Sequence, residues 1–366
     1  MPTHETVFVT GATGLVGGGV LKRMLGGDPQ LRAYVLVRDE LRWRAASRRL
    51  GSLADRVVPV QGDLTARRLG IEYWTRHRLA REVTMIVHAA ADTSFSRPLA
   101  QARLSNAEGT REMLSLARHC GGLRRFAHVS TAFVAGRQVG MIRERDNGNA
   151  EGWVNSYERS KYDAEALVRD SGVDWVIFRP STIVCTGVEG SIPQINAVHR
   201  ALRVYHRGLA AMMPGARSDL LDVVTADYVN DSIARVTVNP SAARKTLHLC
   251  AGRGALPLGE LVDGAYELWA RDPIWRNRGI EKAVLTDLET YTLFANSVIE
   301  TGDARLGAVL SCLSHFIPQL ALSKQFDTTV ADKLNGCTAP PVRSYWSAML
   351  TQLLNGNWGV APEEAA

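Results

Sequence analysis

A tyrosine and a lysine four residues apart, Tyr157 and Lys161, form the pair of side chains in this sequence best suited to carbonyl chemistry. Residues with this spacing share one face of a helix, and a helix is expected over 156–171. A nearby ammonium stabilises phenolate, so we expect it to lower the pKa of the tyrosine from its reference of about 10. The pair predicts a general acid that protonates a carbonyl oxygen.

Two hydroxyl residues, Ser130 and Thr131, stand at the end of a predicted strand over 126–130, one loop before this pair. Ligands of open parallel sheets bind at the carboxyl ends of strands. A tyrosine and lysine at this spacing are by themselves commonly a surface pair. Together with the hydroxyls, they predict that hydroxyl, phenol and ammonium converge on one carbonyl oxygen.

A glycine-rich turn, Gly11-Ala12-Thr13-Gly14-Leu15-Val16-Gly17, follows a short β-branched run over 6–10 and precedes a helical pattern over 15–25. Glycines in such a turn permit close approach of the backbone to a pyrophosphate, whose charge the helix N-terminus favours. The alternative is a merely flexible connection. The surrounding strand–helix–strand pattern favours a dinucleotide site.

Arg38 ends the second predicted strand, where an acidic residue would indicate NAD and an arginine indicates the 2′-phosphate of NADP. Arg48 belongs to an arginine-rich helix that adds positive charge. Asp39 and Glu40 follow directly and favour NAD, although they stand one position late. Asp63, after the third strand, either accepts a hydrogen bond from the adenine amino group or only forms a turn.

Continuous apolar strands alternate with helices through the first part of the chain, which predicts an α/β fold with a doubly wound parallel Rossmann sheet. The predicted strands cover 6–10, 33–38, 57–60, 85–88, 126–130, 173–179, 220–224 and 246–250. The predicted helices cover 15–25, 40–50, 72–81, 99–120, 156–171 and 228–238. We expect a cofactor-binding domain over 1–250, with 186–218 on the substrate side. A smaller, mostly helical substrate or lid domain is expected over 251–366.

Composition is that of a globular protein of 366 residues, with 46% hydrophobic residues and a formal net charge of +6. The arginines lack interleaved aromatics, so an anionic small molecule is favoured over nucleic acid or a membrane surface. The five cysteines are widely separated, which indicates reduced thiols: Cys120, Cys185, Cys250, Cys312 and Cys337. Cys185 and Cys250 lie in apolar runs, so we expect both to be buried.

No apolar stretch reaches the length of a membrane span, and the immediate entry into a strand leaves no room for a signal peptide. These features predict a cytoplasmic protein. No cluster of histidine, cysteine or carboxylate has metal-ligand spacing, so we expect no metal. His88 and His128 are expected to be structural.

Several motifs occur in the order typical of extended short-chain dehydrogenases/reductases, which the first half of the chain resembles: TGATGLVG, GDL, HAAA, NAEGT, HVSTAFVAG, YERSK and FRPS. The segments ADTSF, HVSTAFVAG and YERSK are most similar to the fatty acyl-CoA reductase and thioester reductase branch. This branch includes the terminal reductase domains of carboxylic acid reductases and of nonribosomal peptide synthetases.

The resemblance implies roles for individual residues. Thr131 would bind the substrate oxygen, Tyr157 would donate the proton, Lys161 would hold the nicotinamide ribose, and Asn106 would support the helix and a water path behind the lysine. The implied NADP(H) contacts are Thr10, Gly11, Thr13, Gly14, Leu15, Val16, Gly17, Arg38, Arg48, Asp63, Leu64, Ala89, Ala90, Ala91, Lys161, Pro180 and Ile183.

The implied activity is NADPH-dependent reduction of an acyl thioester, carried by CoA or by a separate carrier protein, to an aldehyde and, with a second hydride, to an alcohol. Aromatic residues late in the chain would form the acyl pocket, or else are simply core: Trp269, Trp275, Phe294, Phe316, Tyr345 and Trp346. Two alternatives stay open. One is a reductase of a free ketone, aldehyde, alcohol or nucleotide-sugar, and the other is a non-catalytic NADP sensor.

Overall fold

Seven parallel strands form the central sheet of the computed structural model, which describes residues 5–300, 307, 310 and 314–359. The strand order is β12-β7-β5-β4-β1-β2-β3. Their bounds are Thr6–Thr10 (β1), Arg32–Val37 (β2), Val57–Gln61 (β3), Met85–His88 (β4), Arg125–Val129 (β5), Trp175–Pro180 (β7) and Lys245–Leu249 (β12). The predicted doubly wound α/β sheet is confirmed. Its order reverses between β1 and β4, where such folds bind ligands.

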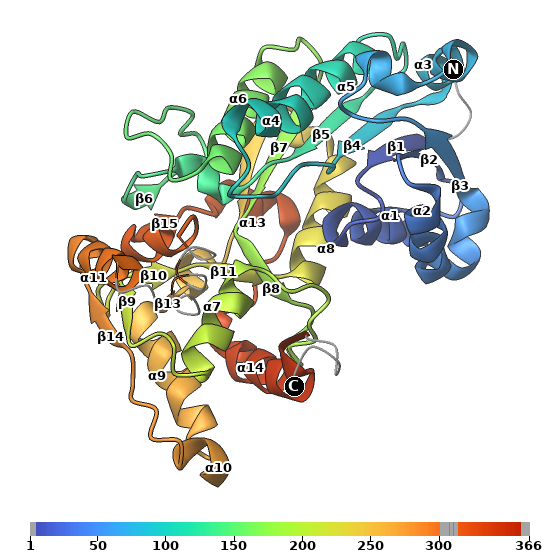
Figure 1. Cartoon of the computed structure of the whole chain (residues 1–366). Helices are drawn as coiled ribbons and strands as arrows, with labels where there is room; N and C mark the ends of the chain where they lie inside the picture. The colour runs from blue at the N-terminus through green and yellow to red at the C-terminus, as the bar shows by residue number, and fades with distance from the viewer. Residues whose placement is uncertain (1–4, 301–306, 308–309, 311–313, 360–366) are drawn as a thin grey trace.

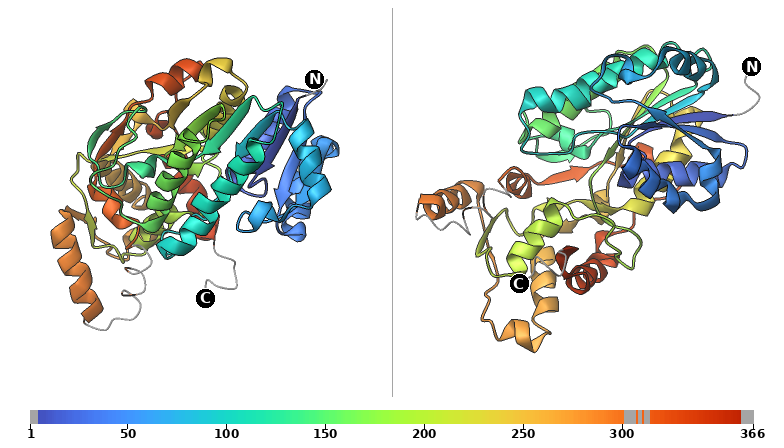
Figure 2. Two further views of the ribbon diagram at one scale, coloured as in Figure 1. Left: turned by 90° about the horizontal axis from the view of Figure 1, so that it is seen from above. Right: turned by 45° about the vertical axis from the view of Figure 1, so that its right-hand side comes forward.

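Helices cover both faces of this sheet (Figures 1 and 2). One face carries α1 (Leu15–Gly27), α2 (Glu40–Ser47) and α8 (Ala226–Thr237). The other carries α3 (Tyr73–Glu82), α4 (Leu99–Arg103), α5 (Gly109–Ala117) and α6 (Ser156–Arg169). A π-helical turn, Leu104–Glu108, joins α4 to α5, so the helix expected over 99–120 is interrupted where Asn106 lies.

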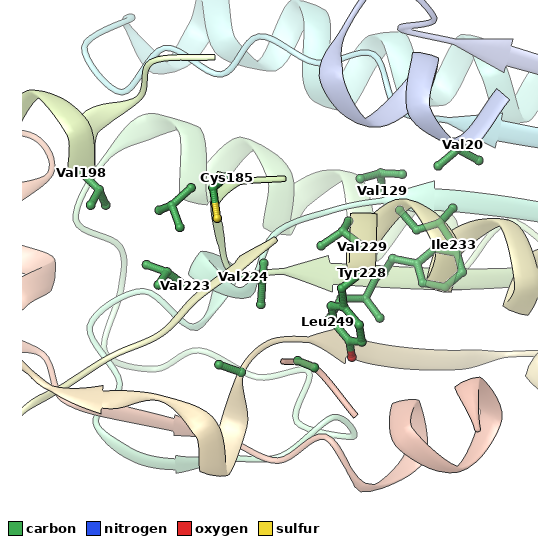
Figure 3. Close-up of a cluster of buried hydrophobic side chains, with 14 of the residues drawn as sticks. Val20, Val129, Cys185, Val198, Val223, Val224, Tyr228, Val229, Ile233 and Leu249 are labelled. Carbon is green, nitrogen blue, oxygen red and sulfur yellow. The ribbon is translucent and has the colours of Figure 1, made fainter. Parts of the chain in front are cut away.

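Alternation along the strands explains why both faces are apolar. In β1, Val7 and Val9 belong to the core under α1 and α8, whereas Phe8 belongs to the core under α5. Figure 3 shows the first of these cores, where Tyr228, Val229 and Ile233 of α8 lie close to strand residues. Continuous apolar runs are therefore expected in the inner strands β1, β4, β5 and β7, which have no solvent face, whereas the edge strand β3 is largely exposed.

Short strand pairs connect the later part of the chain to the region around the sheet. These pairs are β8 (Thr182–Cys185) with β11 (Val223–Thr225), β10 (Leu220–Leu221) with β13 (Leu256–Pro257), β9 (Met212–Pro214) with β14 (Val284–Thr286), and β6 (Gly140–Ile142) with β15 (Lys324–Phe326). The single strand expected over 220–224 is wrong. It breaks at Asp222, whose buried carboxylate accepts hydrogen bonds from the amides of Ala251 and Gly252 at 2.9 and 2.8 Å.

The later part of the chain is mostly helical, as expected. Its helices are α7 (Ala197–His206), α9 (Leu258–Trp269), α10 (Pro273–Arg276), α11 (Leu288–Glu300), α13 (Thr329–Asn335) and α14 (Trp346–Asn355). One apolar cluster extends from the sheet into α9 and α14. A domain boundary at residue 250 therefore stays a prediction, and residues 301–306, 308–309, 311–313 and 360–366 of the expected second domain lie outside the described residues.

Four cysteines are free thiols. Cys120, Cys185 and Cys250 are buried, as expected for the last two, and Cys337 is exposed. Burial raises the pKa of Cys185 to about 12, with a smaller contribution from Asp227. Cys312 lies outside the described residues. Across the part of the chain that the structure describes, no helix is long and apolar enough to cross a bilayer.

Candidate active site

The glycine turn lies against the loop that follows β4. Gly11 has φ +72°, and a Cβ there would lie 2.8 Å from the amide nitrogen of Ala90. A Cβ on Gly17 would lie 2.4 Å from the carbonyl oxygen of Gly11, so this glycine lets α1 pack on the end of β1. Thr13 and Gly14 are exposed, and no side chain caps α1. The first-turn amides of α1 are thus suited to a phosphate group.

A chain of buried hydrogen bonds holds the loop 89–91 in place. Thr10 Oγ accepts from the Ala90 amide (3.1 Å) and bonds to His88 Nδ1 (2.8 Å), and His88 Nε2 bonds to Thr110 Oγ (3.0 Å). Thr110 in turn donates to the Asn106 carbonyl at 2.6 Å. Burial, with a smaller effect of Lys161, lowers the pKa of His88 to about 3. His88 is neutral and structural, and the side chain of Thr10 supports the loop.

Of the residues expected at the adenosine end, Arg38 and Asp63 follow β2 and β3, and Arg48 follows α2. Arg38 and Arg48 are exposed. Asp39 caps α2 by accepting from the Arg42 amide at 3.0 Å. Glu40 pairs with Arg44 within the same helix. Both carboxylates therefore make their contacts within α2, one as its N-cap and the other as an ion-pair partner.

Asp63 makes the turn that was the alternative to adenine binding. Its Oδ1 accepts from the amide and the hydroxyl of Thr65, both at 2.8 Å. Partial burial opposes ionisation, but these bonds and the charge of Arg38 hold the pKa of Asp63 below its usual value. Leu64, next along this loop, is partly buried near Gly109. Contact with adenine stays a prediction.

Thr131 and Tyr157 meet at the carboxyl end of β5. Thr131 is buried, and its Oγ accepts from the Phe133 amide at 3.2 Å. Its side chain also lies close enough to the Tyr157 hydroxyl to favour the ionised phenolate. Asn155 caps α6 by accepting from the Glu158 amide at 3.0 Å, which places Tyr157 in the first turn of the helix. The Tyr157 ring lies 5.6 Å from that of Phe95, centroid to centroid.

Lys161 is turned toward the end of β5. Its Nζ donates to the Val129 carbonyl at 2.8 Å and lies 3.4 Å from His128 Nε2. Burial lowers the pKa of Lys161 to about 8. Burial also raises the pKa of Tyr157 to about 12, and Thr131 only partly opposes this rise. The expected lowering of the tyrosine pKa by Lys161 is therefore wrong for this polypeptide, because desolvation of the phenolate dominates.

Asn106 joins the loop after β4 to helix α6. Its Oδ1 accepts from the Asp92 amide (2.8 Å), and its Nδ2 donates to the Asp92 carbonyl and to Ser160 Oγ, both at 2.9 Å. Ser160 donates to the Tyr157 carbonyl at 2.9 Å. The buried amide thus positions α6 relative to the loop after β4, which is expected to contact the cofactor. The resemblance likewise implied that Asn106 supports this helix.

A buried ion pair fixes the other side of α6. Glu165 accepts from Arg179 Nε at 2.9 Å and from Arg179 Nη2 at 2.7 Å, and also pairs with Arg169. Arg179 belongs to β7, so this bidentate pair joins the helix to the sheet. Pro180 ends the same strand and is buried, whereas Ile183 lies in β8 and is partly buried.

An apolar cavity of about 40 Å³ lies among α7, α9 and the segment before β15. Its walls include Tyr205, Leu261, Phe316, Leu320 and Trp346. Phe316 stacks on Phe95, with centroids 6.4 Å apart. Two rings therefore separate the cavity from Tyr157. Of the other expected pocket aromatics, Trp269, Trp275 and Tyr345 are core, and Phe294 is partly exposed on α11.

Sequence reasoning assigned no role to Phe95, which lies beside the Tyr157 ring, or to the bonded residues Glu158, Gln319 and Lys324. Phe95 lies in the motif ADTSF and Glu158 in YERSK, but neither motif indicated a function for these two residues. Gln319 is 161 residues from its partner Glu158 and carried no local signal. Within the described ranges, no group of three metal-ligating side chains occurs.

A family model described as male sterility protein, an NAD-binding domain, matches residues 9–233. The chain belongs to this family. The match begins in β1 and ends in α8, so it includes the glycine turn, Thr131, Tyr157 and Lys161. The extended short-chain dehydrogenase/reductase resemblance is thereby confirmed.

Curated relatives of this male sterility family member match it over only part of their own length. A putative fatty acyl-CoA reductase of Drosophila melanogaster is 27% identical over 63% of this chain and 51% of its own length. A nonribosomal peptide synthetase of Aspergillus flavus is 26% identical over 68% of this chain and 26% of its own. The chain thus spans about half of the first relative and a quarter of the second.

Solved structures extend the similarity to the C-terminal part. The terminal R domain of the myxalamid biosynthetic pathway is 27% identical and superposes with a TM-score of 0.80, covering 98% of this chain and 93% of that one. The reductase domain of a Mycobacterium tuberculosis nonribosomal peptide synthetase has a TM-score of 0.70 at 21% identity, over 98% and 93% of the two chains. The second likeness shows the fold alone.

Proposed function

We propose that the protein is an NADPH-dependent reductase that converts an acyl thioester to an aldehyde. The observation that carries the proposal is the placement of Thr131 beside the Tyr157 hydroxyl, at the sheet edge that also holds the glycine turn. Relatives named as fatty acyl-CoA reductases and peptide synthetases support a thioester substrate. The thioester is carried by CoA or by a separate carrier protein. We also propose a cytoplasmic location, with which the free thiols of the described cysteines are consistent.

The glycine turn Gly11–Gly17 would hold NADPH, which when bound would supply the hydride that reduces the thioester carbonyl. Thr131 and Tyr157 hold the developing oxyanion, an effect of about 3–4 kcal/mol per donor in comparable sites. Tyr157 gives its proton to that oxygen, and the resulting hemithioacetal expels the thiol to leave an aldehyde. Lys161, positively charged below its pKa of about 8, favours the negative charge that forms nearby.

Release of thiol separates this activity from reduction of free carbonyl compounds. The protein is incubated with NADPH and octanoyl-CoA, and both NADPH oxidation and free CoA thiol are followed. We expect the two signals to rise together. NADPH oxidation with ketones or nucleotide-sugars and no thiol from any acyl-CoA would favour the first alternative. NADPH binding with no turnover on any substrate would favour the non-catalytic sensor.

Arg38 is expected to select NADPH. In the Arg38→Asp variant, loss of a charge-assisted bond to the 2′-phosphate and the new repulsion should weaken NADPH binding roughly 10–100-fold. NADH binding should be unchanged or improved, because a carboxylate accepts from the ribose hydroxyl. Titration of each cofactor by calorimetry measures the ratio. Arg118→Asp, at another exposed arginine, is the control and should leave the ratio unchanged.

A further inference from the structure

A buried polar network joins the catalytic helix to the segment before β15. Glu158, directly after Tyr157, is 1% exposed, and Gln319 Nε2 donates to its Oε1 at 2.6 Å. Lys324 is 4% exposed, and its Nζ donates to Gln319 Oε1 at 2.9 Å and to the Leu322 carbonyl at 3.1 Å. Lysine, glutamine and glutamate thus form one line from the start of β15 to the first turn of α6.

The same turn of α6 holds this segment at a second point. Asn155 Nδ2 donates to the His315 carbonyl at 3.1 Å and to Glu158 Oε1 at 3.0 Å. Glu158 Oε2 accepts from the Val154 amide at 2.9 Å. Residues 315–324 are therefore tied, at His315 and at Gln319, to the two residues that flank Ser156 and Tyr157, and Lys324 holds Gln319 from the far end of the segment.

This tied segment also forms part of the apolar cavity. Phe316 and Leu320 lie in the cavity wall, and Phe316 stacks on Phe95, whose ring contacts Tyr157. Movement of the segment would consequently move the cavity wall relative to the phenol. The hydrogen bonds connect residues 315–324 to α6, and the stacked rings connect the same segment to Phe95 beside Tyr157.

Burial of these charges has a cost that an apolar filling would avoid. Burial raises the pKa of Glu158 to about 7 and lowers that of Lys324 to about 8, so each charged form is disfavoured. Buried ion pairs are often no more stabilising than well-packed apolar residues, whereas they can specify a unique arrangement. The network is therefore better explained by placement of the segment than by stability alone.

We propose that Glu158, Gln319 and Lys324 are positioning residues that keep the cavity wall aligned with the Tyr157 hydroxyl, and thereby set which acyl chain lengths bind productively. This inference rests on the proposed thioester reduction for its substrate class. It concerns the placement of the wall, and none of the three side chains acts on the reacting atoms.

Substitution of Lys324 tests the proposal. Lys324→Met keeps the length of the side chain and removes the charge. We expect decanoyl-CoA to bind about tenfold more weakly, roughly the effect of losing burial of two methylene groups, while butyryl-CoA stays within about twofold. Calorimetry measures both affinities, and the ratio of KM values should follow with little change in kcat. The double variant Glu158→Gln/Lys324→Met should recover part of the loss, because no buried carboxylate then remains without the nearby positive charge of Lys324.

Two further variants keep the test decisive. Gln319→Asn shortens the middle link and should change the same ratio even if Lys324→Met folds poorly. Glu144→Gln is the matched control, since Glu144 is also buried and binds the Val330 and Ala331 amides of α13 at 2.6 and 3.0 Å. It should lower stability and leave the decanoyl/butyryl ratio unchanged.

Equal weakening of both acyl-CoAs in Lys324→Met, or an equal change of the ratio in Glu144→Gln, would show a structural role only and overturn the proposal. Thiol release by the unmodified protein is scored separately. Its absence would refute thioester reduction, whereas the binding ratio tests the network without requiring turnover.

Discussion

Replacement of Tyr157 by phenylalanine should lower kcat for acyl-CoA reduction at least about 100-fold, the usual size of a general acid contribution. The variant keeps the ring that packs against Phe95 and loses the hydroxyl that lies beside Thr131. NADPH affinity should stay within about threefold, because the removed group acts on the transition state. Stopped-flow NADPH oxidation and calorimetry measure the two quantities.

Tyr162→Phe is the control on the same helix. Its hydroxyl donates to the Asn147 carbonyl at 3.0 Å, outside the proposed site, so kcat should change little. Unchanged turnover in Tyr157→Phe would remove this residue from the chemistry. The pH profile gives an independent check. Since the pKa of Lys161 is lowered to about 8, its charge is present below that pH, and the reductive rate should fall as pH rises through it.

Loss of the buried carboxylate at Glu165 should produce the largest change in stability. Glu165→Gln leaves Arg179 charged, 2% exposed and without its bidentate partner. Breaking one side of a buried pair typically costs about 3–5 kcal/mol of unfolding free energy. Urea unfolding followed by circular dichroism measures this free energy, and Tyr157 should lose its fixed position with α6.

An exposed pair provides the comparison. Glu108→Gln removes a partner of Arg111 on the surface of the protein and should cost at most about 1 kcal/mol. A similar small cost for Glu165→Gln would contradict the anchoring role. The pH dependence has a defined sign. Burial opposes ionisation, but Arg179 holds the pKa of Glu165 at about 2, so this stability is present above about pH 4.5 and is lost as pH falls toward 2.

Local patterns were sufficient for the sheet and for the parts of the site carried on its strands. Apolar runs located β1, β4 and β5 within one residue, since a strand buried on both faces has no other composition available. The spacing of Tyr157 and Lys161 likewise located α6. Such features depend only on neighbours in sequence.

Contacts between distant segments could not be predicted in the same way. Strands β6 and β15 are three residues each, and their pairing brings Ile142 beside Phe326 without any periodic signal. The pKa of Tyr157 was missed for a related reason. Helical spacing fixed where Lys161 stands, but the Val129 carbonyl determined where its ammonium points.

The pairing of β15 with β6 also has a consequence for biosynthesis. A ribosome makes the chain from its N-terminus, so the glycine turn and α6 emerge long before Lys324–Phe326 can join Gly140–Ile142. The nascent protein therefore has its glycine turn early and the cavity wall around Phe316 and Leu320 late. Long-range closure of this kind slows folding, and under the proposed role of Lys324 it would delay selection among acyl chains until β15 has docked on β6.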